Sequence, residues 1–509
     1  MTKNYAEHIV KGSALIFIIS IAMNLIGYLI RIFLAHSLTP TEYGLIYSTI
    51  AFLGLINIFR GLGMTDTLRK KIPEFLEKNN YVKIKSSIVF TFIIQSLYTV
   101  IIISLIFIFI KPITTNILKS YEGTIVLIIL ALSTLITVAY QVILASLQGL
   151  QSVKIYTTID LLSYLMKFSF IVFLIVPFGV LALPYAYLFT AILMSIITYL
   201  IFRIKFSEIV KSKLEIDKNL TKEILYFSTP IMIGYVASSV VSNVDTILIS
   251  IFRSLEDVAL YQVAHPLASL LLLVSGAITI VLLPTVSELW TKNKKETLSN
   301  MLGLLTKALF ILIIPLALIM IAFPENVISM LFGEQYLGAS LTLQILSIGM
   351  IIATLSYIFG SSIIGIGKPG LNTKIAFVIM GVNIVFNIIL IQIFGIVGAA
   401  ISLIISNLVG FFLLSYFAKK YIRVYMQWFN LLKIFVGGFL TLLIIFAIKT
   451  ILITSPWIEL IISLVAGFIF YAFFILITKS ITKDEIKILT EINLPIPKVF
   501  VKFTFKILD

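Results

Sequence analysis

Four basic side chains lie within apolar stretches of this 509-residue chain. They are Arg31, Arg60, Lys167 and Lys307. A charged group in hydrocarbon is costly, and such groups usually face the interior of a helix bundle or a water-filled cavity. We therefore predict that these four cations line a cavity, where an anionic ligand would be their natural partner.

Other polar side chains recur on the apolar stretches at helical spacing, so that they share helix faces. These are Asn24 and Tyr28 beside Arg31, Asp160 and Tyr164 beside Lys167, Asp245, the pair Tyr261 and His265, and the pair Asn383 and Asn387. Packing alone does not require a polar stripe on so many stretches, whereas a hydrated central cavity does. We predict that these residues line that cavity or couple transport to an ion.

Structural roles are the alternative for several of these residues. Arg31 and Asp245 could form a salt bridge that only fixes two parts of the fold. Arg60 and Lys307 lie near the ends of their stretches, so their long side chains could instead reach lipid phosphates. His265 could be a hydrogen-bonded histidine of the interior. Asp160 and Lys167 are about 10 Å apart by helical rise, which disfavours direct pairing and favours a role in the cavity.

The elements that must position these residues follow from composition. The chain is 60% hydrophobic and 12% charged, with a mean hydropathy of +1.12, whereas soluble proteins are roughly 45–50% apolar and about a quarter charged. This excludes an ordinary cytosolic enzyme, a disordered chain and a disulfide-stapled secreted domain. Apolar runs of about 20 residues, the length that crosses a bilayer, recur throughout. They predict an all-α polytopic membrane protein with about 14 transmembrane helices, at 12–35, 43–63, 88–110, 122–147, 155–176, 180–202, 223–249, 258–286, 301–323, 340–365, 372–394, 396–418, 431–453 and 457–479.

The basic residues support this topology. With the N-terminus placed in the cytoplasm, 30 Lys and Arg fall in inner segments and four in outer loops, as the positive-inside rule requires. The imbalance predicts a multi-pass protein of the cell membrane with both termini in the cytoplasm. It also accounts for the net charge of +15 without nucleic acid as a partner.

The sequence predicts an internal repeat, in which the first two spans correspond to the seventh and eighth. At an offset of 214 residues, EYGLIY aligns with EDVALY, and Arg31 with Asp245. Transporters are often built from two such halves with the binding site between them. The predicted organisation is an N-terminal lobe at 1–202, a basic cytoplasmic linker at 203–222, a C-terminal lobe at 223–418, two further spans at 419–479 and a basic cytoplasmic tail at 480–509. Linker and tail could lie on the anionic inner membrane surface or be simply solvated.

Motifs of soluble enzymes are missing from the sequence. There is no P-loop, GxSxG or HExxH motif, no Cys, and only three His. We therefore expect no catalytic residues, no metal site and no cofactor, and an energy source other than ATP. Whether Na⁺ or H⁺ is coupled is left open.

Three segments resemble the oligosaccharide flippases, the polysaccharide-transporter family of the multidrug/oligosaccharidyl-lipid/polysaccharide flippase superfamily. They are RIFLAHSLTPTEYGLIYSTIAFLGLINIFRGLG, EDVALYQVAHPLASLLLLVSGAITIVLLPTVSEL and LFGEQYLGASLTLQILSIGMIIATLSYIFGSSIIGIGKPG. With GIVGAAISLIISNLVG, the likeness covers about residues 10–480. The resemblance implies two six-helix lobes around a central cavity, two further helices, and alternating access.

The resemblance also implies a substrate, a polyprenyl-linked oligosaccharide carried from the inner to the outer leaflet for surface polysaccharide or glycoprotein assembly. Membrane lipid and glycan-assembly enzymes would then be its partners. Arg31 and Arg60 match cavity cations of the lipid II relatives in span and approximate position. A multidrug or organic-cation antiporter of the same superfamily, a membrane enzyme acting on lipid-linked glycans, and a scramblase without coupling are the alternatives. The antiporter would require an anionic cavity, and the enzyme would require a larger loop outside the membrane.

Overall fold

The computed structural model describes residues 2–424, 427–451 and 456–480. The predicted tail at 480–509 therefore lies outside the described residues, apart from Ser480. The chain forms two compact units, Met1–Ala259 and Leu260–Asp509. The predicted lobe, linker and tail boundaries stay a prediction.

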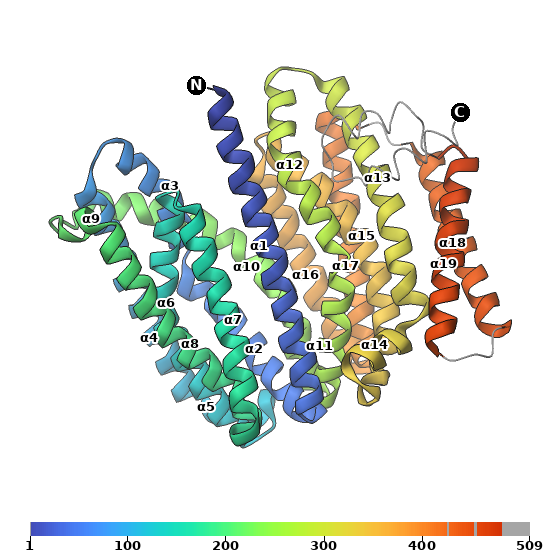
Figure 1. Cartoon of the computed structure of the whole chain (residues 1–509), viewed down its shortest axis with the longest axis horizontal. Helices are drawn as coiled ribbons and strands as arrows, with labels where there is room; N and C mark the ends of the chain where they lie inside the picture. Colours follow the sequence, from blue (N-terminus) through green and yellow to red (C-terminus); the bar gives the residue numbers. More distant parts are fainter. Residues whose placement is uncertain (1, 425–426, 452–455, 481–509) are drawn as a thin grey trace. The chain divides into compact units, whose positions relative to one another are not determined.

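The first unit is built from long helices joined by short turns (Figure 1). Its helices are α1 (Thr2–Ser37), α2 (Pro40–Gly61), α3 (Met64–Glu77), α4 (Tyr81–Ile108), α5 (Ile110–Ile113), α6 (Glu122–Gly149), α7 (Val153–Phe178), α8 (Ala182–Lys205), α9 (Ser207–Lys211) and α10 (Lys218–Phe252). A turn of π-helix follows α5 at Thr114–Leu118, and a 3₁₀ turn joins α7 to α8 at Gly179–Leu181.

The second unit has the same construction. It begins within α11 (Leu255–Ser269) and contains α12 (Leu272–Thr291), α13 (Lys295–Ala322), α14 (Pro324–Phe332), α15 (Ser340–Gly365), α16 (Pro369–Phe394), α17 (Ile396–Ile422), α18 (Trp428–Ile451) and α19 (Pro456–Ile477). A 3₁₀ segment at Glu334–Ala339 precedes α15. The helices α18 and α19 lie side by side (Figure 1).

The prediction of an all-α polytopic membrane protein is confirmed. Every predicted span falls on a helix, but eleven stretches of the described residues are long and apolar enough to cross a membrane, so the number 14 is not confirmed. One of the eleven, Val153–Lys205, contains both α7 and α8. The predicted span 258–286 is divided in the structure, because α11 ends at Ser269, three residues after Pro266, and α12 begins at Leu272.

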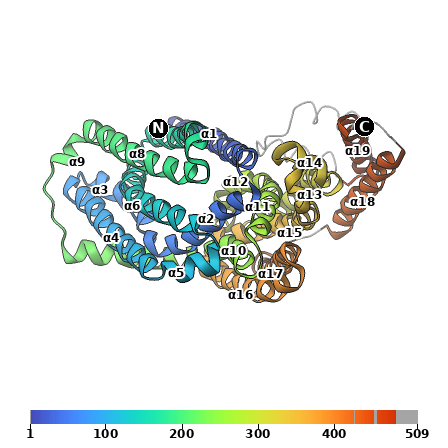
Figure 2. The same cartoon turned by 90° about the horizontal axis from the view of Figure 1, so that it is seen from below.

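One helix is central to each unit. In the first, α6 contacts α2, α3, α4, α7 and α8, and the view from below shows it among α2, α3, α4 and α8 (Figure 2). In the second, α15 contacts α12, α13, α14, α16 and α17. These are the fourth and tenth predicted spans, so equivalent helices of the predicted repeat take the same place in their own units.

The helix starts α2 and α11 also share a local structure. The side chain of Thr39 accepts a hydrogen bond from the backbone N–H of Glu42, whose carboxylate accepts one from the backbone N–H of Thr39. Ser254 and Asp257 form the same reciprocal cap at the start of α11. Such a capping box satisfies N–H groups that a helix start leaves without partners. The caps correspond at an offset of 215 residues, one more than the sequence alignment predicts.

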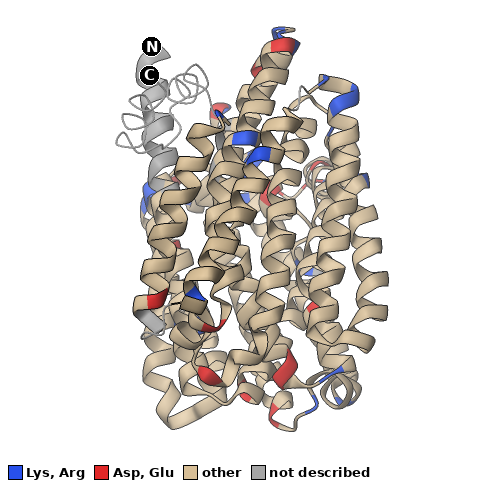
Figure 3. Ribbon diagram, turned by 90° about the vertical axis from the view of Figure 1, so that its right-hand side faces the viewer, with Lys and Arg blue, Asp and Glu red and all other residues tan. Residues whose placement is uncertain are grey.

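Charged residues lie mainly toward the helix ends, and the long middle parts of the helices hold few of them (Figure 3). The predicted basic linker is packed against α4. The ammonium group of Lys85 donates hydrogen bonds of 2.7 Å to the carbonyl oxygens of Val210 and Ser212, and the backbone N–H of Glu215 donates one of 2.9 Å to Ser86. This part of the linker is therefore held by the first unit.

Gly398 allows α17 to approach α16 closely. A Cβ atom at this position would lie 2.0 Å from the carbonyl oxygen of Leu390. We therefore expect Gly398→Ala to lower the free energy of unfolding by about 1–3 kcal/mol, the usual cost of overpacking. Gly381→Ala in α16 is the control, since nothing lies within 4 Å of its Cβ position. Thermal unfolding of the purified variants measures the difference, and equal stability of the two would contradict the close approach.

Candidate substrate site

A cavity of about 200 Å³ lies among α2, α6, α7 and α8 of the first unit. Most of its lining residues are polar, and two of them are cations. The lining residues are Asn57, Arg60, Ser133, Thr134, Thr137, Tyr140, Gln141, Ser163, Lys167, Tyr187, Thr190, Ala191 and Met194. The structure thus brings together two of the four predicted cations, Arg60 from α2 and Lys167 from α7.

Arg60 is held by neutral groups of α6. Its Nη1 donates a hydrogen bond of 2.9 Å to the carbonyl oxygen of Thr134, and its Nη2 donates one of 2.8 Å to Oε1 of Gln141. These two bonds hold the guanidinium group against α6. No carboxylate within the described residues forms a salt bridge with it. Its positive charge is available to an anion in the cavity.

Lys167 projects between two aromatic rings. Its Nζ lies 4.8 Å from the ring centroid of Tyr164 and 5.2 Å from that of Tyr187. Among the residues that the structure describes, it has neither a carboxylate within 4.0 Å nor a hydrogen-bond acceptor. Cation–π contacts compensate part of the lost hydration, but three ammonium protons are left to bind a ligand.

Asp160 does not line the cavity but contacts a residue that does. It accepts a hydrogen bond of 3.0 Å from the hydroxyl group of Tyr140, which itself lines the cavity. No salt bridge joins Asp160 to Lys167 in the described part of the chain, and the role of Asp160 in the cavity stays a prediction. The negative charge of Asp160 still lowers the net positive charge around the cavity and attracts Lys167 through space.

A polar groove of about 380 Å³ in the same unit shares Asn57 with this cavity. The groove runs between α2, the start of α3 and α10. Its polar lining residues are Asn57, Thr65, Asp66, Tyr235, Ser238, Ser239, Ser242 and Asn243. Hydroxyl, amide and carboxylate groups of this kind can exchange hydrogen bonds with the hydroxyl groups of a sugar.

A hydrogen bond and a salt bridge join α3 to α10 at the wall of the groove. Tyr235 donates a hydrogen bond of 3.0 Å to Asp66. Lys71 forms salt bridges of 2.6 Å with Glu223 and 2.7 Å with Glu74. Burial lowers the pKa of Lys71, but the hydrogen bonds and charges of Glu223 and Glu74 outweigh burial, so the pKa lies above its ordinary value. Lys71 therefore stays charged at neutral pH and holds α10 against α3.

The predicted residues of α1 lie elsewhere in the first unit. The guanidinium group of Arg31 lies 4.3 Å from the ring centroid of Tyr47 in α2. Tyr28 is partly buried, and Asn24 is exposed, with its amide bonded to the carbonyl oxygen of Ser20 in its own helix.

Asp245 is buried in α10, and whether it pairs with Arg31 stays a prediction. It lies in the part of α10 that packs on α2, where Ser48 and Ser250 share a hydrogen bond of 2.9 Å.

In the second unit, the predicted residues are placed between helices. Lys307 in α13 is 1% exposed, and its ammonium group donates a hydrogen bond of 3.0 Å to Gln427. Tyr261 and His265 stack, with ring centroids 5.5 Å apart. Asn383 and Asn387 are fully buried in α16; the amide of Asn383 lies 3.5 Å from the hydroxyl of Ser406 in α17. Their roles as substrate or coupling residues stay predictions.

Several cavity residues escaped the sequence prediction. Thr134, Thr137 and Gln141 are spaced at i, i+3 and i+7 on α6, and Tyr187 and Thr190 at i and i+3 on α8. This spacing places each set on one helix face. The signal was present, but single neutral residues in an apolar span stand out less than a charge.

Known proteins resemble the chain over most of its length. The family model described as "Polysaccharide biosynthesis protein" matches residues 9–290, and the MatE model matches residues 230–389. "Uncharacterized membrane protein MJ1068" of Methanocaldococcus jannaschii is 30% identical over 431 residues, which are 82% of this chain and 85% of that protein.

Two further similarities concern proteins named as flippases. "Probable low-salt glycan biosynthesis flippase Agl15" of Haloferax volcanii is 24% identical over 78% of this chain and 80% of its own. The solved structure "Lipid II flippase MurJ, inward closed conformation" has the same fold, with a TM-score of 0.73 at 18% identity, over 91% of this chain and 98% of that one. With a family model over more than half of its length and a relative at 30% identity, the chain belongs to the polysaccharide biosynthesis protein family, within the multidrug/oligosaccharidyl-lipid/polysaccharide flippase superfamily.

Proposed function

We propose that the protein is a flippase that carries a polyprenyl-(pyro)phosphate-linked oligosaccharide from the cytoplasmic to the outer leaflet of the cell membrane. It is a transporter, not an enzyme, and works by alternating access. Both termini lie in the cytoplasm, where the excess of Lys and Arg is expected. The exported glycan would serve assembly of a surface polysaccharide or glycoprotein.

The observation that carries this proposal is the pair of cations in one polar cavity. Arg60 and Lys167 line the same cavity, and neither forms a salt bridge with a carboxylate in the described residues. A diphosphate needs such cationic donors, and charge-assisted hydrogen bonds to them are the strong ones. The neighbouring groove offers hydroxyl and amide groups for the sugars. The polyprenyl chain can stay in the bilayer.

The relatives support the same substrate class. The Haloferax volcanii relative is named a probable glycan biosynthesis flippase, and the similar solved structure is that of a lipid II flippase. We extend to this chain what these names share, the transport of a lipid-linked glycan. An antiporter for organic cations would have little use for two unpaired cations in its cavity, since like charges repel in a medium of low dielectric constant.

Flipping by the purified protein in vesicles tests the proposal. A fluorescent polyprenyl-diphosphate glycan is placed in both leaflets, and an impermeant quencher reports the fraction that becomes accessible. We expect faster exchange in vesicles that contain the protein than in empty vesicles. Transport of a fluorescent organic cation is the second arm. Vesicles that transport the cation but not the glycolipid would contradict the flippase and favour the antiporter.

A further inference from the structure

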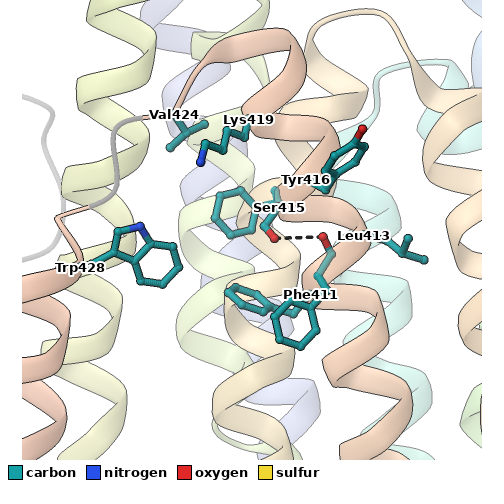
Figure 4. A pocket seen from close by; sticks show the side chains of 9 residues that line it. Phe411, Leu413, Ser415, Tyr416, Lys419, Val424 and Trp428 are labelled. Carbon is teal, nitrogen blue, oxygen red and sulfur yellow. Dashed lines mark hydrogen bonds between the residues drawn. The ribbon is translucent and has the colours of Figure 1, made fainter.

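A third hollow, about 690 Å³ in volume, lies on the second unit and shares no residue with the cavity of Arg60 and Lys167 or with the polar groove. It is formed by α15, the C-terminal half of α17 and the start of α18 (Figure 4). We name it the aromatic groove; it is lined by Phe359, Phe411, Phe412, Leu413, Ser415, Tyr416, Lys419, Val424 and Trp428. Its composition, aromatic walls with one cation, differs from that of the substrate site.

The walls of the aromatic groove suit hydrocarbon. The rings of Phe359 and Phe411 lie 5.9 Å apart, and those of Phe411 and Phe412 lie 5.7 Å apart. Phe412 and Trp428 are 64% and 63% exposed, so large apolar faces are open to whatever fills the groove. In a bilayer such faces contact acyl chains rather than water.

One end of the aromatic groove is polar and positive. Lys419 is exposed in the last turn of α17, and within the described residues its ammonium group forms no hydrogen bond or salt bridge. The hydroxyl group of Ser415 donates to the carbonyl oxygen of Phe412 in its own helix, at 3.1 Å (Figure 4). Lys419 is therefore the group in the groove that attracts an anion. Trp428 supplies an indole N–H at the same part of the groove, and Trp is enriched where membranes meet water.

We propose that the aromatic groove binds an anionic phospholipid of the bilayer, with acyl chains against the phenyl rings and the phosphate on Lys419. An amphiphile with one negative headgroup beside its hydrocarbon chains matches a cation at one end of an apolar groove. The expected side of the membrane agrees, since Lys419 belongs to the inner basic segments and the inner leaflet is rich in anionic lipid. A neutral lipid would fill the walls but leave Lys419 without a counter-charge.

Lipid titration of the purified full-length protein tests this proposal. Phosphatidylglycerol and phosphatidylcholine with the same acyl chains are each added to the protein in detergent, and binding is followed by native mass spectrometry. We expect tighter binding of phosphatidylglycerol. Lys419→Gln should weaken it by about fivefold, the equivalent of about 1 kcal/mol for one Lys at the membrane surface. Lys420→Gln is the matched control, because Lys420 is exposed on the next position of α17 but does not line the groove.

A second variant keeps the test decisive if Lys419→Gln alters folding. Ser415→Trp places a large ring inside the groove and leaves Lys419 intact, so it should reduce binding of phosphatidylglycerol while Lys419→Arg retains it. Equal binding of the two lipids, or equal binding by the native protein and Lys419→Gln, would overturn the proposal. So would displacement of phosphatidylglycerol by an equimolar polyprenyl phosphate, which would assign the groove to the substrate. Glycolipid flipping is measured separately, so failure here leaves the proposed function standing.

Discussion

Replacing Lys167 by Gln is expected to reduce glycolipid flipping at least thirtyfold. Removing one partner of a buried charge pair costs about 2–5 kcal/mol, because the other charge is left without compensation. Here the stranded charge would be the phosphate of the substrate. Lys167 has no hydrogen bond or salt bridge in the described residues, so the fold loses its contacts with Tyr164 and Tyr187 and the attraction of Asp160. The flipping rate in vesicles, at matched protein content, measures the effect.

The control for this variant lies on the same helix. Lys154 is exposed near the start of α7 and does not line the cavity, so Lys154→Gln should flip the glycolipid at the native rate. The unfolding temperature of Lys167→Gln should equal or exceed that of the native protein, because a buried charge that forms no salt bridge destabilises a fold. Native flipping by Lys167→Gln would show that this cation does not bind the substrate.

A membrane potential is expected to drive the glycolipid outward. A diphosphate carries about two negative charges, and each is worth about 2.3 kcal/mol per 100 mV. Arg60 and Lys167 belong to the protein and return with it in each cycle, so the substrate's charges cross uncompensated. An interior negative by about 100 mV therefore favours export by roughly 4–5 kcal/mol, which corresponds to about a thousandfold ratio between the leaflets.

Vesicles with a potassium gradient and valinomycin allow this measurement. The glycolipid should accumulate in the outer leaflet when the interior is negative and in the inner leaflet when the gradient is reversed. Without valinomycin, the two leaflets should stay equal. Flipping that is indifferent to potential in both directions would count against potential-driven transport and favour either a coupled ion or an uncoupled scramblase.

Helix positions could be predicted from the sequence because hydrocarbon imposes a length and a composition on each crossing. The predicted span at 340–365 coincides with α15, and that at 372–394 lies within α16. The number of crossings was harder to predict. The predicted span 258–286 is apolar throughout, yet it is divided after Ser269. There the backbone N–H groups of Leu270 and Leu271 bond to carbonyl oxygens three residues back, a change that hydropathy does not record.

The candidate site was predictable where charge marked it. Arg60 and Lys167 stood out because an isolated cation in hydrocarbon needs a reason, and the structure places both in one cavity. Asn383 and Asn387 carried a similar signal but are buried in α16, near Ser406 of α17. Polar groups also join helices to each other in membranes, so a polar stripe alone does not tell a cavity from a helix contact.

Gln141 is a residue of the site whose role the sequence does not indicate. It lies on a helix that is apolar for most of its length, and its importance comes from the guanidinium group of Arg60, which is 81 residues away in the chain. Such a contact depends on how α2 packs on α6. Periodicity indicates which face of a helix is polar, but not which residue of a distant helix will meet it.

Binding of the substrate headgroup tests the central claim most directly. The affinity of the purified protein is measured for a polyprenyl-diphosphate glycan and for the same glycolipid without the diphosphate, in the native protein and in the double variant Arg60→Gln/Lys167→Gln. We predict that the native protein prefers the charged glycolipid at least thirtyfold, by about 2–5 kcal/mol, and that the double variant loses this preference. A preference of equal size in both proteins would contradict the assignment of these two cations to the phosphate.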